Sequence, residues 1–108
     1  MIHLEPVGPD NWRVGRLRVT EAQKHFVADA MTILARAYAY RESRSRALLI
    51  CLDGVPIGMA LYYDWEEGRA FNLSQFYIDE RWQGNGYGTE AARLLIEEMR
   101  REGRFDRV

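Results

Sequence analysis

Three glycines stand at alternate positions, 84, 86 and 88, in the stretch QGNGYG. The residues before them, FNLSQFYID, are typical of a strand, and the residues after them, TEAARLLIEEMR, have the apolar spacing of an amphipathic helix. Glycine permits backbone angles that side chains disfavour, and the first amide N–H groups of a helix have no partner within the helix. The pattern therefore predicts an anion pocket suited to a phosphate.

The letters around these glycines exclude the two best-known phosphate loops. No Gly-Lys-Ser/Thr follows, so the stretch is not a Walker loop, and Thr89 stands where the dinucleotide fingerprint requires its last glycine. The preceding segment also predicts a hairpin strand, not the first strand of a doubly wound parallel sheet. A nucleotide-binding regulator is accordingly the weakest of the functional hypotheses.

The rest of the chain predicts the elements that position this turn. MIHLEPV predicts a first strand, and apolar residues recur at helical spacing from about Val27 to Tyr40. Asp53-Gly54 predicts a tight hairpin between two strands, and a second hairpin is expected to turn at 66–68. The expected buried stripes are Val27, Met31, Leu34, Ala37 and Tyr38 in the first of these helices and Ala91, Ala92, Leu95 and Met99 in the last.

We therefore expect an α+β fold, a mostly antiparallel sheet with helices packed on it, in the order β-α-α-β-β-β-α. Asp10 or Asn11 is a possible cap in the segment after the first strand, and Thr20 and Gln23 have the spacing of a capping box before the helical region. The length of 108 residues predicts a single domain over residues 1–108.

The composition of the chain does not indicate a binding partner. The net charge of -1 provides no basic field for nucleic acid. The longest aliphatic run, residues 47–52, is too short to cross a bilayer, and the N-terminus has no signal-peptide pattern, so we expect a cytoplasmic protein without membrane contact. Cys51 has no second cysteine to pair with and is expected to pack as a small hydrophobe. His3 and His25 are too far apart in sequence to suggest a metal site.

Read as Q-x-x-G-x-G, the stretch from Gln83 to Gly88 resembles the GCN5-related N-acetyltransferases, the GNAT family. The resemblance implies that backbone amides of this loop bind the pyrophosphate of acetyl-coenzyme A. It also implies that the preceding strand offers main-chain groups to the pantetheine arm. Carried over by position, the cofactor contacts are Tyr77, Ile78, Gln83, Gly84, Asn85, Gly86, Tyr87, Gly88 and Thr89.

Two further stretches, PDNWRVGRLRVTEAQKHFVADAMTILARAYAY and DGVPIGMALYYD, resemble the bacterial diamine and polyamine N-acetyltransferases. This resemblance implies that a small-molecule amine accepts the acetyl group. A polyamine needs carboxylates, and the DWEEG turn offers Asp64, Glu66 and Glu67, with Tyr63 and Trp65 for cation–π contacts. Acidic residues and glycine are also what an ordinary hairpin turn contains, and that alternative stays open.

The sequence departs from the family pattern at the catalytic positions. Where some members have a glutamate that relays the proton, this chain has Asn72, which cannot act as a base, although Asn72, Ser74 and Tyr77 can order a chain of waters. The catalytic residues therefore stay unassigned, with Asn72 kept as a substrate-binding candidate.

After its last predicted helix the sequence ends at GRFDRV, whereas the family continues with a fifth strand, another helix that carries a tyrosine acid, and closing strands. We therefore expect a C-terminally truncated version of the fold, in which the fourth strand is an open edge. Open edges recruit other chains, so a homodimer is expected. The alternative to an enzyme is a non-catalytic module of the same fold that binds coenzyme A or dimerises.

Overall fold

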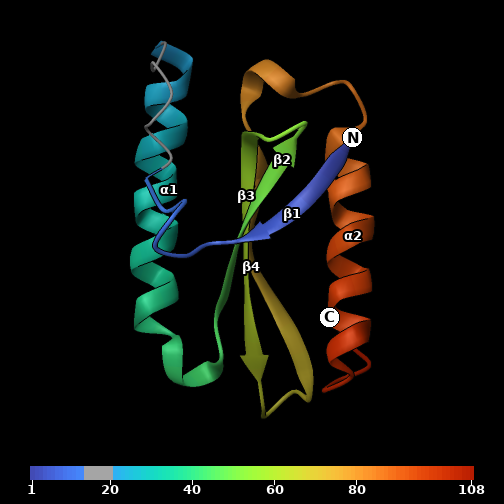
Figure 1. Cartoon of the computed structure of the whole chain (residues 1–108). Coiled ribbons are helices and arrows are strands. Elements are labelled where there is room, and N and C mark those ends of the chain that lie inside the picture. The colour runs from blue at the N-terminus through green and yellow to red at the C-terminus, as the bar shows by residue number, and fades with distance from the viewer. Residues whose placement is uncertain (14–20) are drawn as a thin grey trace.

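The computed structural model of the chain describes the backbone of residues 1–13 and 21–108 and the side chains of residues 1–13 and 29–108. Four strands form one antiparallel sheet in the order β1-β2-β3-β4, which confirms the α+β class (Figure 1). The elements are β1 (Ile2–Pro6), α1 (Glu21–Ala39), η2 (Arg41–Ser43), β2 (Arg46–Leu52), β3 (Val55–Trp65), β4 (Ala70–Ile78), η3 (Glu80–Trp82) and α2 (Tyr87–Glu102).

Both predicted hairpins are present. Asp53 and Gly54 join β2 to β3 with positive φ angles of 49° and 83°, the backbone that a tight turn between twisted strands requires. Residues 66–69 form the turn between β3 and β4. The turn residues alone therefore predicted the two hairpins that join β2, β3 and β4.

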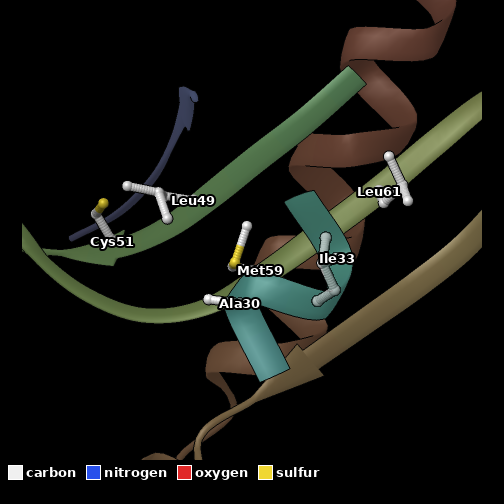
Figure 2. Close-up of a cluster of buried hydrophobic side chains, with 6 residues drawn as sticks. All are labelled: Ala30, Ile33, Leu49, Cys51, Met59 and Leu61. Carbon is white, nitrogen blue, oxygen red and sulfur yellow. The ribbon is translucent and has the colours of Figure 1, made fainter. Parts of the chain in front are cut away.

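The sheet is covered on both faces, with α1 on one side and α2 on the other (Figure 1). Because successive side chains of a strand point to opposite faces, the apolar strands β2 and β3 supply both layers of the core. Figure 2 shows the layer under α1, which consists of Ala30, Ile33, Leu49, Cys51, Met59 and Leu61. The layer under α2 includes Ile2, Leu48, Ile50, Ile57, Ala60, Tyr62, Phe71, Ile78, Ala91, Leu95 and Met99.

A β-bulge in β4 changes which face its residues meet. Leu61 pairs with Gln75 and the next residue of β3 pairs with Leu73, so Ser74 is the extra residue. Phe71 and Phe76, an odd number of positions apart, consequently both pack on the α2 side. Beyond the bulge, Tyr77 packs against the layer under α1.

The N-terminal helical region is present as α1, which begins at Glu21, at the predicted capping box, and includes most of the apolar repeat predicted from about Val27 to Tyr40. The predicted capping box includes Thr20, which lies outside the described residues. The first of the two helices expected before β2 falls mainly on residues 14–20 and lies outside the described residues as well. Close to it, Asn11 accepts a hydrogen bond from the backbone N–H of Gly8 at 2.7 Å and so closes a turn.

The predicted buried stripe of α1 is wrong at two of the positions whose side chains are described, and the side chain of Val27 lies outside the described residues. Met31 and Tyr38 are 39% and 68% exposed, whereas Ala30 and Ile33 are buried. Apolar spacing alone cannot distinguish two adjacent stripes on one helix, and the smaller Ala30 lets the helix approach the sheet more closely. The Tyr38 ring instead lies under the guanidinium of Arg41 at 4.2 Å.

The stripe of α2 agrees with the prediction, since Ala91, Leu95 and Met99 are buried and Ala92 is half-buried. Cys51 is fully buried, as expected of a small hydrophobe. Among the described helices, none combines the length with the apolar character that a bilayer-spanning segment requires.

Candidate functional site

The glycine turn that the sequence singles out has the conformation that only glycine adopts easily. Gly84 and Gly86 have φ angles of 80° and 79°. A Cβ added at either position would meet nothing within 4 Å, so the backbone angle, and not lack of space, requires glycine there. The same observation means that the space above the turn is open.

Gly86 is the N-cap of α2 and has no side chain with which to cap it. The first helical hydrogen bond runs from the backbone N–H of Glu90 to the carbonyl oxygen of Gly86 at 3.2 Å. The preceding amides, from Tyr87 to Thr89, are the first-turn donors that no bond within the helix satisfies. With the positive end of the helix dipole added, this turn has the features of an anion site.

The acidic residue in this first turn does not oppose an anion with its full charge. Glu90 is engaged by Arg93 one turn further along α2, at 2.6 Å. Both side chains are exposed, and the hydrogen bond from Arg93 lowers the pKa of Glu90. The carboxylate of the first turn is therefore already paired on the helix surface.

Side-chain amides hold the turn in shape. Gln83 donates through Nε2 to the carbonyl oxygen of Ile78 at 2.8 Å, which joins the turn to the end of β4. Asn85 donates to the carbonyl oxygens of Trp82 and Gln83 at 3.3 and 3.2 Å. Both side chains bond to backbone atoms at the turn, so the contribution of Gln83 and Asn85 to an anion site is to hold the backbone of the turn in position.

A groove of about 530 Å³ lies between α1 and the end of β4. It brings together three of the predicted cofactor residues, Tyr77, Ile78 and Gln83, with polar side chains of α1. Among the described residues, its lining consists of Asp29, Thr32, Ile33, Arg36, Gln75, Tyr77, Ile78, Asp79, Glu80 and Gln83. The last of these residues leads directly into the glycine turn, so the groove and the anion site are continuous along the chain.

Acidic residues dominate this groove. Among the described lining residues, Asp29 comes from α1 and Asp79 and Glu80 follow β4, and Arg36 is the one arginine. Burial, followed by the charges of Asp29 and Asp79, raises the pKa of Tyr77 well above its ordinary value. Its phenol therefore stays protonated at neutral pH and can donate a hydrogen bond into the groove.

The two walls of the groove are tied together and shaped by contacts that the sequence did not suggest. Arg36 of α1 donates through Nη1 to the hydroxyl of Ser74, the bulge residue, at 3.4 Å. Gly58 in β3 permits the close approach of β4, because a Cβ there would lie 2.2 Å from the carbonyl oxygen of Tyr77. The available signal for Gly58 was a glycine inside a strand, which often marks such an approach.

The α1 residues of the groove were also missed by the sequence analysis. Asp29, Thr32 and Arg36 recur at helical spacing and form a polar stripe beside the buried Ile33. Polar residues on a helix normally indicate a solvated surface, so their spacing alone did not distinguish a groove wall from an ordinary exposed face.

The acidic hairpin turn lies elsewhere, and arginines engage its carboxylates. The side chain of Asp64 is 1% exposed and accepts hydrogen bonds from Arg46 at 3.0 Å and from Arg104 at 2.6 Å. Arg104 also pairs with Glu66, and Glu67 is exposed in the turn. Within the described part of the chain, these predicted substrate residues do not line the groove.

Asn72 likewise lies outside the groove lining that the described residues define. It donates through Nδ2 to the hydroxyl oxygen of Tyr63 at 3.1 Å, and the Tyr63 ring stacks on Tyr40 at 4.5 Å. Of the three residues expected to order waters, the structure places Tyr77 in the groove and Ser74 against Arg36.

The C-terminal segment contacts the beginning of β4. The backbone N–H of Phe71 donates to the carbonyl oxygen of Arg107 at 2.8 Å. The ring of Phe105 meets that of Phe71 edge-on at 5.2 Å. RFDRV thus adds to β4 at the opposite end of the strand from the groove.

The sequence profile of the acetyltransferase (GNAT) family matches residues 11–108, nearly the whole chain. Among curated proteins, none matches the sequence. The family profile covers the glycine turn, the groove and the acidic hairpin alike.

Solved structures share the fold at low sequence identity. A GNAT family acetyltransferase from Elizabethkingia anophelis with acetyl-CoA bound is 14% identical, with a TM-score of 0.54 over 93% of this chain and 58% of its own. The ribosomal-protein-alanine N-acetyltransferase of Brucella melitensis biovar Abortus 2308 is 15% identical, with a TM-score of 0.65 over 99% and 76%. An acetyltransferase from Thermus thermophilus is 23% identical, with a TM-score of 0.57 over 90% and 68%. The chain thus spans less than two thirds of the Elizabethkingia structure.

Proposed function

Because this chain belongs to the acetyltransferase (GNAT) family, we propose that it transfers an acetyl group from acetyl-coenzyme A to the primary amine of a small molecule. The family match and the acetyl-coenzyme A in the Elizabethkingia structure support acetyl-coenzyme A as the co-substrate. The observation that carries the proposal is the uncapped, positive-φ glycine turn at α2, which continues directly into the groove beside β4.

In this proposal the cofactor lies along the end of β4 and the start of α2. The first-turn amides from Tyr87 to Thr89 bind the pyrophosphate, and Gln83 and Asn85 hold the turn that presents them. Hydrogen bonds to a charged oxygen contribute about 1.5 to 3 kcal/mol each, so two or three such amides contribute about 3 to 9 kcal/mol to cofactor binding. Tyr77 and Ile78, the last residues of β4, accompany the pantetheine arm as the resemblance implies.

Acetyl-coenzyme A supplies an activated thioester when bound. The acceptor must lose a proton before its nitrogen attacks, because a primary amine is mostly protonated at neutral pH. We propose that Asp29 and Asp79 attract the protonated amine into the groove. The high pKa of Tyr77 suits it to donate a hydrogen bond and not to act as a base. The proton acceptor stays unassigned.

For the amine we favour the groove over the acidic hairpin turn. The carboxylates of Asp64 and Glu66 are engaged by arginines away from the groove, whereas Asp29, Asp79 and Glu80 belong to the lining that also contains the predicted cofactor residues Tyr77, Ile78 and Gln83. A preference for diamines or polyamines, with contacts from Asp64, Glu66, Glu67 and Asn72, stays a prediction, as do the homodimer and the cytoplasmic location.

The test is a calorimetric titration of the chain with acetyl-coenzyme A, followed by an assay of thiol release with a panel of amines and a solution mass. We expect one cofactor per chain and amine-dependent release of coenzyme A. Binding without transfer to any amine would support the non-catalytic coenzyme-A-binding module instead. Absence of binding would overturn both, and equal competition by ATP would favour a nucleotide-binding protein.

A further inference from the structure

Three side chains able to ligate a metal meet at the free edge of the sheet, outside the groove. His3 of β1 pairs directly with Cys51 of β2 in the antiparallel ladder, and Glu5 lies two residues along β1 on the same face. One ligand atom from each of the three lies within 4.8 Å of the others. Cys51 belongs to the face of the sheet that α1 covers (Figure 2).

The spacing of these atoms fits a tetrahedral zinc ion. Cys51 Sγ and Glu5 Oε2 are 3.4 Å apart, and His3 Nε2 and Glu5 Oε2 are 3.7 Å apart. With zinc bonds of about 2.3 Å to sulfur and about 2.0 to 2.2 Å to nitrogen and oxygen, tetrahedral ligand atoms lie about 3.4 to 3.6 Å from one another. The first separation lies within that range and the second lies just above it. The ligand atoms of His3 and Cys51 lie within 4.8 Å of each other, so these two side chains would move closer together on binding zinc.

We propose that His3, Glu5 and Cys51 bind one zinc ion. A thiolate, an imidazole and a carboxylate are ligands that zinc takes together, whereas magnesium and calcium prefer oxygen alone. On binding, the Cys51 S–H bond breaks, a sulfur–zinc bond forms, and the proton passes to the solvent. No oxidant or reductant takes part, and a water completes the fourth position.

The three side chains differ in exposure, so the site is open to solvent on one side and closed on the other. The side chains of His3 and Glu5 are 48% and 49% exposed, so an ion can reach them from solvent. Cys51 is fully buried, and its thiol donates toward Glu5, so the sulfur is reached through the other two ligands. Bound zinc would join the edge strand β1 to β2 and stabilise the folded chain by mass action.

The full-length chain, treated with a chelator and then dialysed, is titrated with zinc chloride by calorimetry and with cadmium chloride by ultraviolet absorption. Because Cys51 is the only cysteine in the sequence, a thiolate-to-cadmium charge-transfer band identifies this residue directly. We expect one metal per chain, a rise in the melting temperature with zinc, and no response to magnesium. One metal per two chains would overturn the proposal, because it would mean that two chains share the ion.

Single substitutions distinguish a site with three ligands from metal binding by the thiol alone. Cys51→Ala removes the absorption band and keeps a small apolar side chain in the core, with folding checked by circular dichroism. His3→Ala and Glu5→Gln each weaken zinc binding by more than about 100-fold, beyond the roughly 10- to 100-fold that the loss of an indirect contact usually costs. The matched control Glu42→Gln changes an exposed acid in η2 and leaves binding unchanged.

Zinc affinity that His3→Ala and Glu5→Gln leave unaltered would overturn the proposal, as would the absence of binding by the wild-type chain. None of these measurements depends on acetyl transfer, so failure here leaves the proposed function standing.

Discussion

Acidic residues lie at both ends of β4, yet the two ends differ in what surrounds them. Before the strand, Asp64 and Glu66 are engaged by Arg46 and Arg104, and the Asp64 side chain is almost fully buried. After the strand, Asp79 and Glu80 line a groove together with Asp29 of α1. Similar residues therefore form a structural clamp before the strand and line a cavity after it.

The clamp before β4 is a network, not a single pair. Glu102 at the end of α2 pairs with Arg46 and accepts a hydrogen bond from the Tyr62 hydroxyl. The Arg46 guanidinium lies over the Tyr62 ring at 4.5 Å. Together with Asp64, these residues join β2, β3 and α2 at one end of the molecule.

The largest expected effect comes from breaking this clamp at its buried member. Asp64→Asn leaves the charges of Arg46 and Arg104 without their shared partner, and breaking a buried ion pair costs about 3 kcal/mol or more. Urea unfolding measures the loss. Because Asp64 is outside the groove lining, the affinity of the folded variant for acetyl-coenzyme A should not change.

Asp53→Asn is the matched control for that change. Asp53 pairs with the N-terminal amine at the surface, with its side chain 77% exposed, and a pair of this kind contributes no more than about 1 kcal/mol. Equal losses from Asp64→Asn and Asp53→Asn would contradict the description of Asp64 as a structural clamp.

At the other end of β4, Gly86→Val should lower the affinity for acetyl-coenzyme A about 100-fold, which is roughly 2.7 kcal/mol. A β-branched residue disfavours the φ of 79°, and its side chain would occupy the open space above the turn. Calorimetry measures the affinity, with chemical unfolding run in parallel.

Gly103→Val separates binding from helix stability. Gly103 ends the same helix with a φ of 66°, and its N–H donates to the Met99 carbonyl oxygen at 3.1 Å, far along α2 from the glycine turn. We expect reduced stability with unchanged affinity. A loss of affinity equal to that of Gly86→Val would refute the assignment of the pyrophosphate to the N-terminus of α2.

The comparison between the two acidic ends is tested directly by charge removal. Asp29→Asn should raise the KM for a cationic amine about tenfold, the equivalent of 1.4 kcal/mol, without changing the KM for acetyl-coenzyme A. Glu66→Gln should change neither the KM for the amine nor the KM for acetyl-coenzyme A by more than about twofold, since exposed ion pairs contribute little. The opposite result, an effect from Glu66 and none from Asp29, would move the amine site to the hairpin turn.

The smallest expected effect is a pH dependence of the clamp. Burial acts to raise the pKa of Glu102, but hydrogen bonds from Arg46 and Tyr62 outweigh it, and the pKa is lowered. Its contribution to stability is therefore fully present above the unfolded value of about 4.3 and is lost as the pH falls through the lower folded value.

Urea unfolding of wild type and Glu102→Gln from neutral pH down to acid checks this sign. The free energies of unfolding of the two proteins should converge as the pH falls. Protonation removes the negative charge of Glu102 in the wild type, and the substitution has already removed it in the variant. A difference that stays constant across the range would show that the ion pair does not contribute through the charge of Glu102.

Several parts of the fold could be predicted because they depend on local chemistry. Asp53-Gly54 located its hairpin, and the spacing from Ala91 to Met99 indicated the buried stripe of α2. The stripe of α1 could not be located as well, since Met31 and Ala30 lie on adjacent lines of one helix and only packing against the sheet selects between them. The bulge at Ser74 has no sequence signal of this kind.

The candidate site was predictable for the same reason only in part. The glycine turn is local, so its letters were sufficient to predict an anion pocket at α2. The groove is built by α1 and β4, far apart in sequence, and Asp29 and Arg36 became candidates only when the fold placed them beside Tyr77. The acids of the hairpin turn were indistinguishable from ligand-binding residues until Arg46 and Arg104 were seen against Asp64.

The sequence by itself indicated the family, located the hairpins and predicted an anion pocket at the glycine turn, because glycine angles and residue spacing act over a few neighbouring positions. Only the tertiary structure decided which carboxylates are neutralised and which line a cavity. It also brought His3, Glu5 and Cys51 together. Charge pairing and ligand geometry depend on distances across the sheet, which the order of residues along the chain does not specify.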